Sequence, residues 1–181
     1  APVFYRHVGA VGDLSRPRDI LLHYSVGSKR GGQLGIDLID AVRSVRPQTS
    51  VTVWTRDVDP GIDAVEVVSG LSEEELCHHY LTHSLLLFPS AFEGAGMPPM
   101  EAMACGCIPI LKAGVGAADT YASHENAVLL GEDIAVNAEM IADLLDHPSA
   151  AEKMRAKAKE AILPFSPSGC GVALLAGMAE V

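Results

Sequence analysis

The sequence predicts an α/β fold in which a parallel sheet carries helices on both faces. Short apolar runs that suit buried strands alternate with longer segments whose apolar residues recur at helical spacing. Such alternation is typical of a parallel sheet joined by right-handed crossovers. At 181 residues, of which 49% are hydrophobic, the chain is also large enough to bury a core.

The expected elements follow one another along nearly the whole chain. Residues 1–18 should form an extended lead-in, and residues 19–181 should form the domain. The strands are expected at residues 19–26, 50–55, 64–68, 84–88 and 107–111. The helices are expected at residues 33–46, 73–82 and 97–105, after Asp133, and after Ser149 to about residue 162.

Three of these helices have side chains suited to cap their first turn. Ser72 with Glu75, and Ser149 with Glu152, have the spacing of a capping box. Asp133 can accept hydrogen bonds from the free N–H groups of the helix that follows it. Helix starts are therefore expected just after each of these capping residues.

The most informative stretch reads FPSAFEGAGMPPMEAMACGC, from Phe88 to Cys107. It predicts a buried strand, a glycine loop and a short helix with prolines in its first turn, where backbone N–H groups have no partner anyway. Gly106 suits the left-handed position just past the helix. The N-terminus of a helix reached through glycines is a site for anions, because free N–H groups and the helix dipole point at the ligand.

Two carboxylates, Glu93 and Glu101, flank this glycine loop with seven residues between them. A carboxylate in the first helical turn can accept from both hydroxyls of a vicinal diol, and a phosphate with a diol describes a nucleotide. Taken singly, each glutamate could instead be an exposed acid, since an acid in the first turn is favourable for the dipole alone. Lys29 and Arg30, just after the first strand, are the cations that could meet a phosphate, or else two solvated surface cations.

The segment EGAGMPPMEAMACGCIPI resembles the signature of family 4 of the retaining glycosyltransferases with a GT-B fold, the glycosyl transferases group 1. Weaker similarity extends over the first strand with its basic pair, the helix of residues 71–80, and residues 124–130. The chain departs from the family pattern at three positions, Ala95 for Phe, Thr120 for Glu and Pro167 for Trp.

The resemblance implies the C-terminal, donor-binding half of such an enzyme, with a Rossmann-like sheet and residues 1–18 as the linker from the other half. Glu93 would act on the donor sugar, and Lys29 with Arg30 would stabilise the departing diphosphate without a metal. Glu101 would bind the ribose diol and Val68 would lie at the base. The further donor contacts implied are Gly27, Gly94, Gly96 and Met97.

The resemblance also implies partners. The nucleotide-sugar is a substrate and no cofactor is expected, while an N-terminal domain of the same enzyme would bind a glycan or glycolipid acceptor. A formal charge of −10 disfavours nucleic acid as a ligand. Scattered cysteines and the lack of a signal-peptide pattern predict a cytoplasmic protein, with any contact to the inner face of the membrane made through the other domain.

Other sites and classes are less well supported. His79 and His83 share a helix face near Cys77, but two ligands without a third give a poor metal site. Cys105 and Cys107 are expected to be small buried thiols. No P-loop, dinucleotide or nucleophile-elbow motif occurs. Two alternatives stay open: half of a sugar-nucleotide epimerase, and a non-catalytic nucleotide-sugar-binding module.

Overall fold

The computed structural model describes residues 4, 6, 16–27, 31–56, 59–64, 66–92 and 96–166. Within them, six strands form one parallel sheet in the order β3-β2-β1-β4-β5-β6. The strands are β1 (Arg18–Tyr24), β2 (Val51–Thr55), β3 (Glu66–Val68), β4 (His83–Phe88), β5 (Ile108–Lys112) and β6 (Val128–Leu130). The predicted α/β class and parallel sheet are therefore confirmed.

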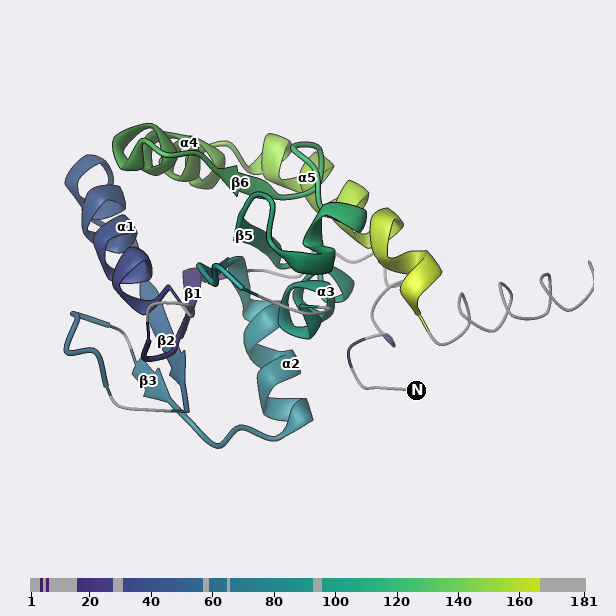
Figure 1. The fold of residues 1–181 in the computed structure, drawn as a ribbon, viewed down its shortest axis with the longest axis horizontal. Coiled ribbons are helices and arrows are strands. Elements are labelled where there is room, and N and C mark those ends of the chain that lie inside the picture. The colour runs from purple at the N-terminus through teal and green to yellow at the C-terminus, as the bar shows by residue number, and fades with distance from the viewer. Residues whose placement is uncertain are drawn as a thin grey trace, which may run out of the picture.

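The helices cover both faces of this sheet (Figure 1). Helices α1 and α4 pack on one face, and α2 and α3 pack on the other, where α5 also contributes. The helices are α1 (Gly32–Val45), α2 (Glu73–Thr82), α3 (Met97–Ala104), α4 (Ile134–Asp146) and α5 (Pro148–Ile162). Two short 3₁₀ helices, η2 (Gly116–Thr120) and η3 (Leu163–Phe165), complete the described elements.

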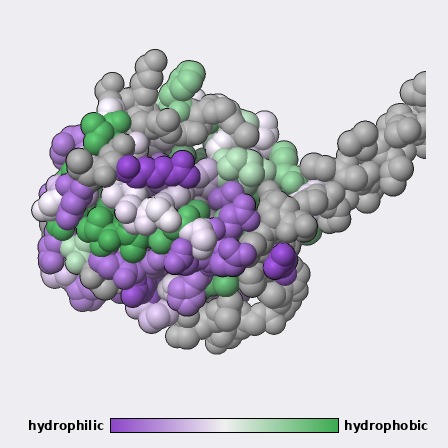
Figure 2. Space-filling view, turned by 90° about the horizontal axis from the view of Figure 1, so that it is seen from below, coloured by the Kyte–Doolittle hydropathy of each residue, from purple (hydrophilic) through white to green (hydrophobic). Residues whose placement is uncertain are grey.

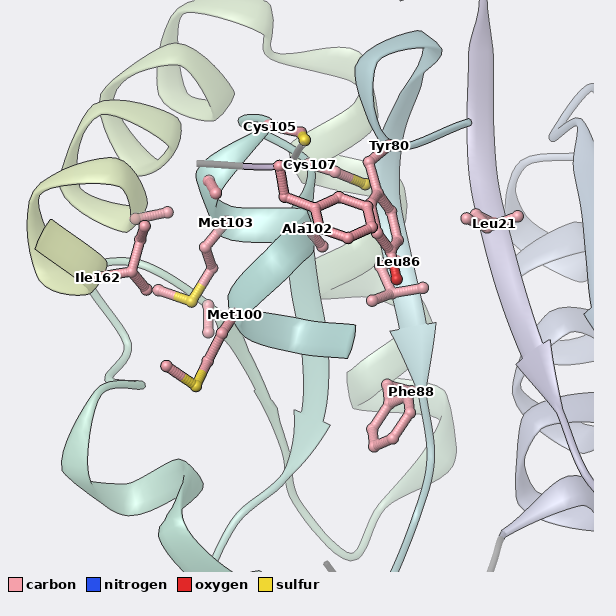
Figure 3. Packing of buried hydrophobic residues seen from close by; sticks show 14 of the residues in the cluster. Leu21, Tyr80, Leu86, Phe88, Met100, Ala102, Met103, Cys105, Cys107 and Ile162 are labelled. Atoms are coloured by element: carbon pink, nitrogen blue, oxygen red, sulfur yellow. The ribbon is translucent and has the colours of Figure 1, made fainter. Parts of the chain in front are cut away.

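The core forms in two layers because successive strand residues point to opposite faces of the sheet. In β4, Leu85 and Leu87 belong to the layer under α1 and α4, and Leu86 and Phe88 belong to the layer under α2 and α3. The second layer also holds Tyr80, whose ring lies against β4 (Figure 3). Strands with both faces buried read as continuous apolar runs, which explains the sequence LLLF.

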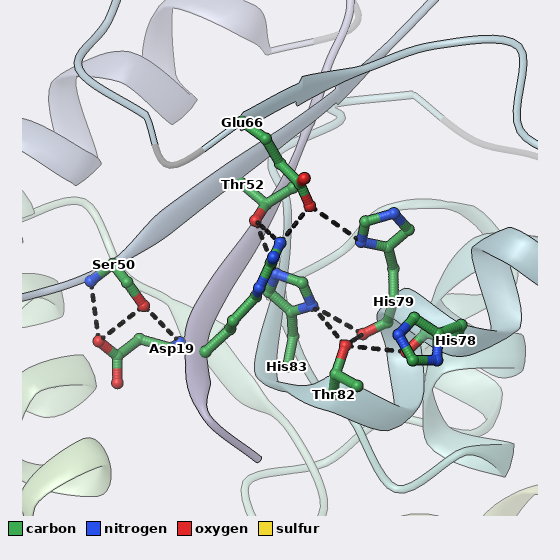
Figure 4. A network of polar contacts seen from close by, with 9 residues as sticks. Asp19, Ser50, Thr52, Glu66, His78, His79, Thr82 and His83 are labelled. Atoms are coloured by element: carbon green, nitrogen blue, oxygen red, sulfur yellow. Dashed lines mark hydrogen bonds and ion pairs between the residues drawn. The ribbon is translucent and has the colours of Figure 1, made fainter.

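The amino ends of the strands are joined by a network of polar side chains (Figure 4). Arg18 donates to Glu66 and to Thr52 Oγ1, and His83 Nε2 lies 2.9 Å from the same hydroxyl. His83 Nδ1 lies 2.7 Å from the His79 carbonyl oxygen, which can only accept, so the proton is on Nδ1 and Nε2 accepts from Thr52. The two histidines with metal-like spacing thus belong to this network.

A half-buried arginine of the lead-in, Arg16, closes the same edge. The Arg16 guanidinium donates to the carbonyl oxygens of Tyr80 at 2.7 Å, of His83 at 2.6 Å and of Cys105 at 2.6 Å. These carbonyls lie where α2 and α3 end, which leaves them without partners inside the helices. A cation at a helix C-terminus also complements the dipole.

Two of the three predicted capping residues mark the start of their helix correctly, and the third does not. Ser72 and Glu75 form the predicted capping box, and Asp133 accepts from the N–H groups of residues 135 and 136 as expected. The predicted box of Ser149 with Glu152 is wrong, because α5 begins at Pro148 with His147 as its cap residue and no side-chain cap. Proline suits the first helical position, so the helix starts before the serine.

Three short elements were missed by the sequence analysis. Residues 128–130, within the stretch that resembles the family, form strand β6 at the sheet edge, residues 116–120 form η2, and residues 163–165 form η3. All three are too short to show a period in the sequence. The remaining element bounds agree with the predictions to within two residues.

Candidate nucleotide site

The sheet order reverses between β1 and β4, and the loops that follow these two strands meet at that point. A Cβ on Gly31, which has φ of 72°, would lie 1.9 Å from the Pro89 carbonyl oxygen. A Cβ on Gly35 would lie 2.8 Å from Leu22 Cδ1. Only glycine therefore lets the start of α1 approach the end of β4 this closely. In open α/β sheets, ligands bind outside the carboxyl ends of the strands where the order reverses.

Helix α3 also begins at this edge, at a glycine held by a tyrosine. Gly96 has φ of 67°, and a Cβ there would lie 2.7 Å from the Tyr121 hydroxyl, which donates to the Gly96 carbonyl at 3.3 Å. Pro98 and Pro99 occupy the first turn and carry no N–H. Among the described residues, the N–H groups of Gly96 and Met97 donate to no other group, so both are available to an anion.

Glu101 lies one turn into α3 on the side that faces α2. The Sγ atoms of Cys77 on α2 and Cys105 on α3 lie 3.6 Å apart, which fixes how the two helices face each other. Glu73 precedes Cys77 by four residues on α2, and Glu101 precedes Cys105 by four residues on α3. Both carboxylates therefore lie on the sides of the two helices that face each other, one turn nearer the carboxyl edge of the sheet. Glu101 is half-buried, and it makes no hydrogen bond within the described part of the chain.

This environment alters the acidity of Glu101. Burial, and then the like charge of Glu73, raise the pKa of the Glu101 carboxyl to about 7. A shifted carboxyl at the mouth of a parallel sheet is typical of functional sites. At pH 8 the group is mostly ionised and can accept two hydrogen bonds, whereas at pH 6 it is mostly protonated.

A pocket opens beside the α3 N-terminus, over the carboxyl ends of β4 and β5. Ser90 is buried in its wall, and Lys112 supplies the one charged side chain among the described residues that line it. Ser90 Oγ donates to the Phe92 carbonyl and accepts from the Phe92 N–H, which holds the start of the glycine loop. The full lining is Phe88, Ser90, Gly96, Pro99, Leu111, Lys112, Val115, Ala118 and Tyr121.

Large apolar side chains are also exposed at this edge. Val26 follows β1 with 57% of its surface exposed, Phe92 follows β4 with 72% exposed, and Met97 opens α3 with 47% exposed. Exposed apolar surface is not confined to these three residues, because the face of the molecule in Figure 2 carries a band of apolar residues bordered by hydrophilic ones. Exposed apolar surface beside a polar site favours contact with a ligand or another protein surface.

The structure describes five of the nine predicted site residues. Gly96, Met97 and Glu101 come together on α3, Gly27 follows β1 with φ of 112°, and Val68 ends β3, all at the carboxyl edge. The other four lie outside the described residues, namely Lys29, Arg30, Glu93 and Gly94. The sequence analysis missed Tyr121, which reaches Gly96 because the chain after β5 folds back over α3, and Lys112, the last residue of β5, which lines the same pocket.

Comparison with known proteins identifies the family. Residues 60–161 match the model for glycosyl transferases group 1. The chain belongs to the group 1 glycosyltransferases. It is 34% identical over 121 residues to D-inositol 3-phosphate glycosyltransferase 1 of Catenulispora acidiphila, an alignment that covers 65% of this chain and 29% of that protein. The matched part of the chain thus spans less than a third of the length of this relative.

Solved structures share the fold. The GtfA/B complex superposes with a TM-score of 0.74 at 15% identity, covering 93% of this chain and 37% of that one. The C-terminal domain of a glycosyl transferase group 1 family protein, LpcC from Francisella tularensis, superposes with a TM-score of 0.67 at 17% identity, covering 82% of this chain and 86% of that one. Anabaena HepE in complex with UDP-glucose superposes with a TM-score of 0.69 at 17% identity, covering 91% of this chain and 49% of that one. The chain therefore has the Rossmann-like α/β fold of GT-B glycosyltransferases.

No helix among the described residues is both long and apolar enough to cross a membrane.

Proposed function

We propose that this chain is the donor-binding domain of a retaining glycosyltransferase that transfers a sugar from a nucleotide-sugar to a glycan or glycolipid. The observation that carries this proposal is the pairing of two features at the point of strand-order reversal. The N–H groups of Gly96 and Met97 are available for a phosphate, and Glu101 is a half-buried carboxyl one turn away. The diphosphate would occupy the helix N-terminus, and the ribose diol would donate to Glu101.

The remaining donor contacts follow from the order of the strands. In this arrangement the diphosphate lies at the carboxyl ends of β1 and β4, and the ribose reaches Glu101. The base then lies toward the end of β3, near Val68. The sugar then lies on the other side, over β4 and β5, where the pocket with Lys112 opens. Family resemblance assigns Glu93 to the sugar, Lys29 and Arg30 to the diphosphate, and Gly27 and Gly94 to further donor contacts.

The chemistry of this half is electrostatic. Cleavage of the anomeric bond builds negative charge on the departing nucleoside diphosphate, and fixed N–H groups with nearby cations stabilise that charge in the transition state. We propose that this stabilisation needs no metal, since backbone donors and basic side chains supply the positive potential. The described residues include no group of three or more histidine, cysteine, aspartate or glutamate side chains that could hold a metal ion.

The acceptor would be bound by a second domain. The chain covers 29% of its curated relative and 37% of the GtfA/B chain that it superposes on, so the whole enzyme has room for another half. The exposed Val26, Phe92 and Met97 lie on the edge that such a half would cover. Closure of two halves positions the acceptor and excludes water from the reacting bond.

Nucleotide binding is the first test of the proposal. We expect the chain to bind at least one of UDP, GDP and ADP in isothermal titration calorimetry at pH 8, with affinity unchanged by EDTA. Glu101→Gln should weaken binding by about 1.5–3 kcal/mol, the range for hydrogen bonds to a charged group. It should also raise the melting temperature at pH 8, because an ionised carboxyl with a raised pKa destabilises the free fold.

Two controls separate the ribose from the phosphates. The 2′,3′-dideoxy analogue of the same nucleotide lacks the diol, so Glu101→Gln should leave its affinity unchanged. Glu139→Gln removes an exposed charge from α4, on the opposite face of the sheet, and should change neither affinity. Equal losses for both nucleotides in Glu101→Gln would contradict the ribose role.

Transfer itself tests whether the chain acts as one half of an enzyme. We expect the chain alone to bind a nucleotide-sugar without transferring the sugar to an oligosaccharide or glycolipid, in assays that follow release of the nucleoside diphosphate. Adding the N-terminal half should restore transfer, and Glu93→Ala should then abolish transfer while nucleoside diphosphate affinity stays within a few-fold. Transfer by the chain alone would show that it is not a half.

A further inference from the structure

The hydroxyl of Tyr80 is a buried polar group without a partner. The side chain is 0% exposed, and its oxygen has no hydrogen bond to any described residue. The ring packs among Phe4, Trp54 and the sulfur atoms between α2 and α3, with ring centroids 5.7 Å from Phe4 and 6.4 Å from Trp54. A phenylalanine would make the same ring contacts without burying an unpaired hydroxyl, so packing does not explain the oxygen.

The hydroxyl points toward the nucleotide edge on the side where Glu101 lies. Helix α2 runs away from the carboxyl edge, and side chains on a helix lean back toward its N-terminus. Figure 3 accordingly shows the Tyr80 oxygen beside Leu86, on the side of the ring nearer Phe88. Glu73, Cys77 and Tyr80 form one stripe of α2, at positions i, i+4 and i+7, and this stripe faces Glu101 and Cys105 on α3.

The electrostatic relation between the two groups agrees with this placement. Burial, and then the Glu101 carboxyl, raise the pKa of Tyr80, so the phenol keeps its proton and remains a donor. Glu101 in turn makes no hydrogen bond within the described residues. A buried donor and a half-buried acceptor, both without a partner, therefore lie on facing sides of two adjacent helices.

We propose that Tyr80 is a positioning residue for Glu101, and that its hydroxyl donates to the Glu101 carboxylate when a nucleotide binds. The inference rests on the proposed role of Glu101 at the ribose. One carboxylate oxygen accepts from Tyr80, which fixes the side-chain rotamer, while the remaining lone pairs accept from the two ribose hydroxyls. Such hydrogen bonds often tighten only when the ligand is bound, which explains why both groups are unpaired in the free protein.

The proposal specifies what removal of one oxygen should do. In calorimetry at pH 8, Tyr80→Phe should weaken binding of the tightest binder among UDP, GDP and ADP by about 3- to 10-fold, the size expected for one hydrogen bond. Binding of the 2′,3′-dideoxy analogue should not change. The melting temperature should stay the same or rise, because the variant removes an unpaired buried hydroxyl.

The pH profile provides a readout that packing alone would not change. In the complex, a donor to the ionised carboxyl lowers the pKa of Glu101 below its value in the free protein, so the loss of that donor should make the fall in nucleotide affinity below pH 7 smaller. In a Glu101→Gln background, Tyr80→Phe should have little further effect on affinity, because the charged acceptor is already gone. Phe4→Leu, which alters the packing of the same ring, should change stability and leave the pH profile in place.

The outcomes are distinguishable. The inference would be overturned if Tyr80→Phe kept the wild-type nucleotide affinity and pH profile while Glu101→Gln lost affinity. That result would leave the proposed function intact. Unchanged affinity in Glu101→Gln would overturn both the inference and the ribose role. A wild-type chain that binds none of the three nucleotides would overturn the proposed function and the inference with it.

Discussion

The two edges of the sheet use polar groups in opposite ways. At the amino edge, Arg16, Arg18 and His83 each pair with carbonyl, hydroxyl or carboxylate groups of elements far away in the sequence. At the carboxyl edge, Glu101 and the N–H groups of Gly96 and Met97 make no hydrogen bond to another described residue. The amino edge therefore holds the elements together, and the carboxyl edge keeps polar groups available for a ligand.

The same division appears in the glycines and the apolar surface. Gly27, Gly31 and Gly96 all have positive φ and lie at the carboxyl edge, together with the exposed side chains of Phe92 and Met97. Glycines with positive φ and exposed apolar side chains are thus concentrated where the ligand would bind. Mutations at the two edges should consequently have separable effects on folding and on binding.

The largest expected effect is at the amino edge. Arg16→Met should lower the free energy of unfolding by on the order of 3–5 kcal/mol, because three carbonyl groups lose a charged donor at once. Urea unfolding followed by circular dichroism measures it, and the exposed Lys153→Ala should change stability by less than about 0.5 kcal/mol. Nucleotide affinity should be unchanged while the variant is folded. A large loss of affinity in folded Arg16→Met would break the distinction between the edges.

A second prediction concerns acid stability. Burial lowers the pKa of His83 to about 4, against 6.5 for an unperturbed histidine, so the fold keeps the imidazole neutral. The contribution of the neutral His83 imidazole to the free energy of unfolding is fully present above pH 6.5. It is lost as the pH falls from 6.5 to 4, because the unfolded chain binds the proton first. The loss should amount to about 3 kcal/mol.

Unfolding titrations between pH 4 and 8 measure this loss. His83→Asn removes the titration and should flatten the stability profile between pH 6.5 and 4, although its stability at pH 8 should be lower than that of the wild type. His124→Gln, at an exposed histidine, should leave the profile unchanged. An equally steep profile in His83→Asn would mean that another group controls acid stability.

The smallest expected effect is at the carboxyl edge and concerns binding. Because the pKa of Glu101 is about 7, nucleotide affinity should fall as the pH drops through 7 and the carboxyl gains a proton. Glu73→Gln removes the nearby like charge, so this fall should move to lower pH by a fraction of a pH unit. Calorimetry from pH 6 to 8.5 measures the midpoint, and Glu139→Gln is the matched control. A midpoint that does not move would place Glu73 too far from Glu101 to matter.

The family signature made much of the carboxyl edge predictable. The positions of Glu101, Gly96 and Met97 at this edge were predicted from a continuous segment, because a loop and the helix that follows it are encoded locally. The capping residues Ser72 and Asp133 were found for the same reason. The incorrect capping box at Ser149 shows the limit of such signals, since Pro148 starts that helix one residue earlier.

By itself, the sequence determined the alternation of strands and helices and the identity of the groups at the glycine loop. Only the tertiary structure decided the strand order and the contact of Gly31 with Pro89. It also decided that Tyr80 and Glu73 lie on the side of α2 that faces Glu101 on α3. Local propensity acts over a few residues, whereas Arg16 pairs with groups 64, 67 and 89 residues away. Such pairings depend on which strands lie side by side, and strand pairing is a property of the packed core as a whole.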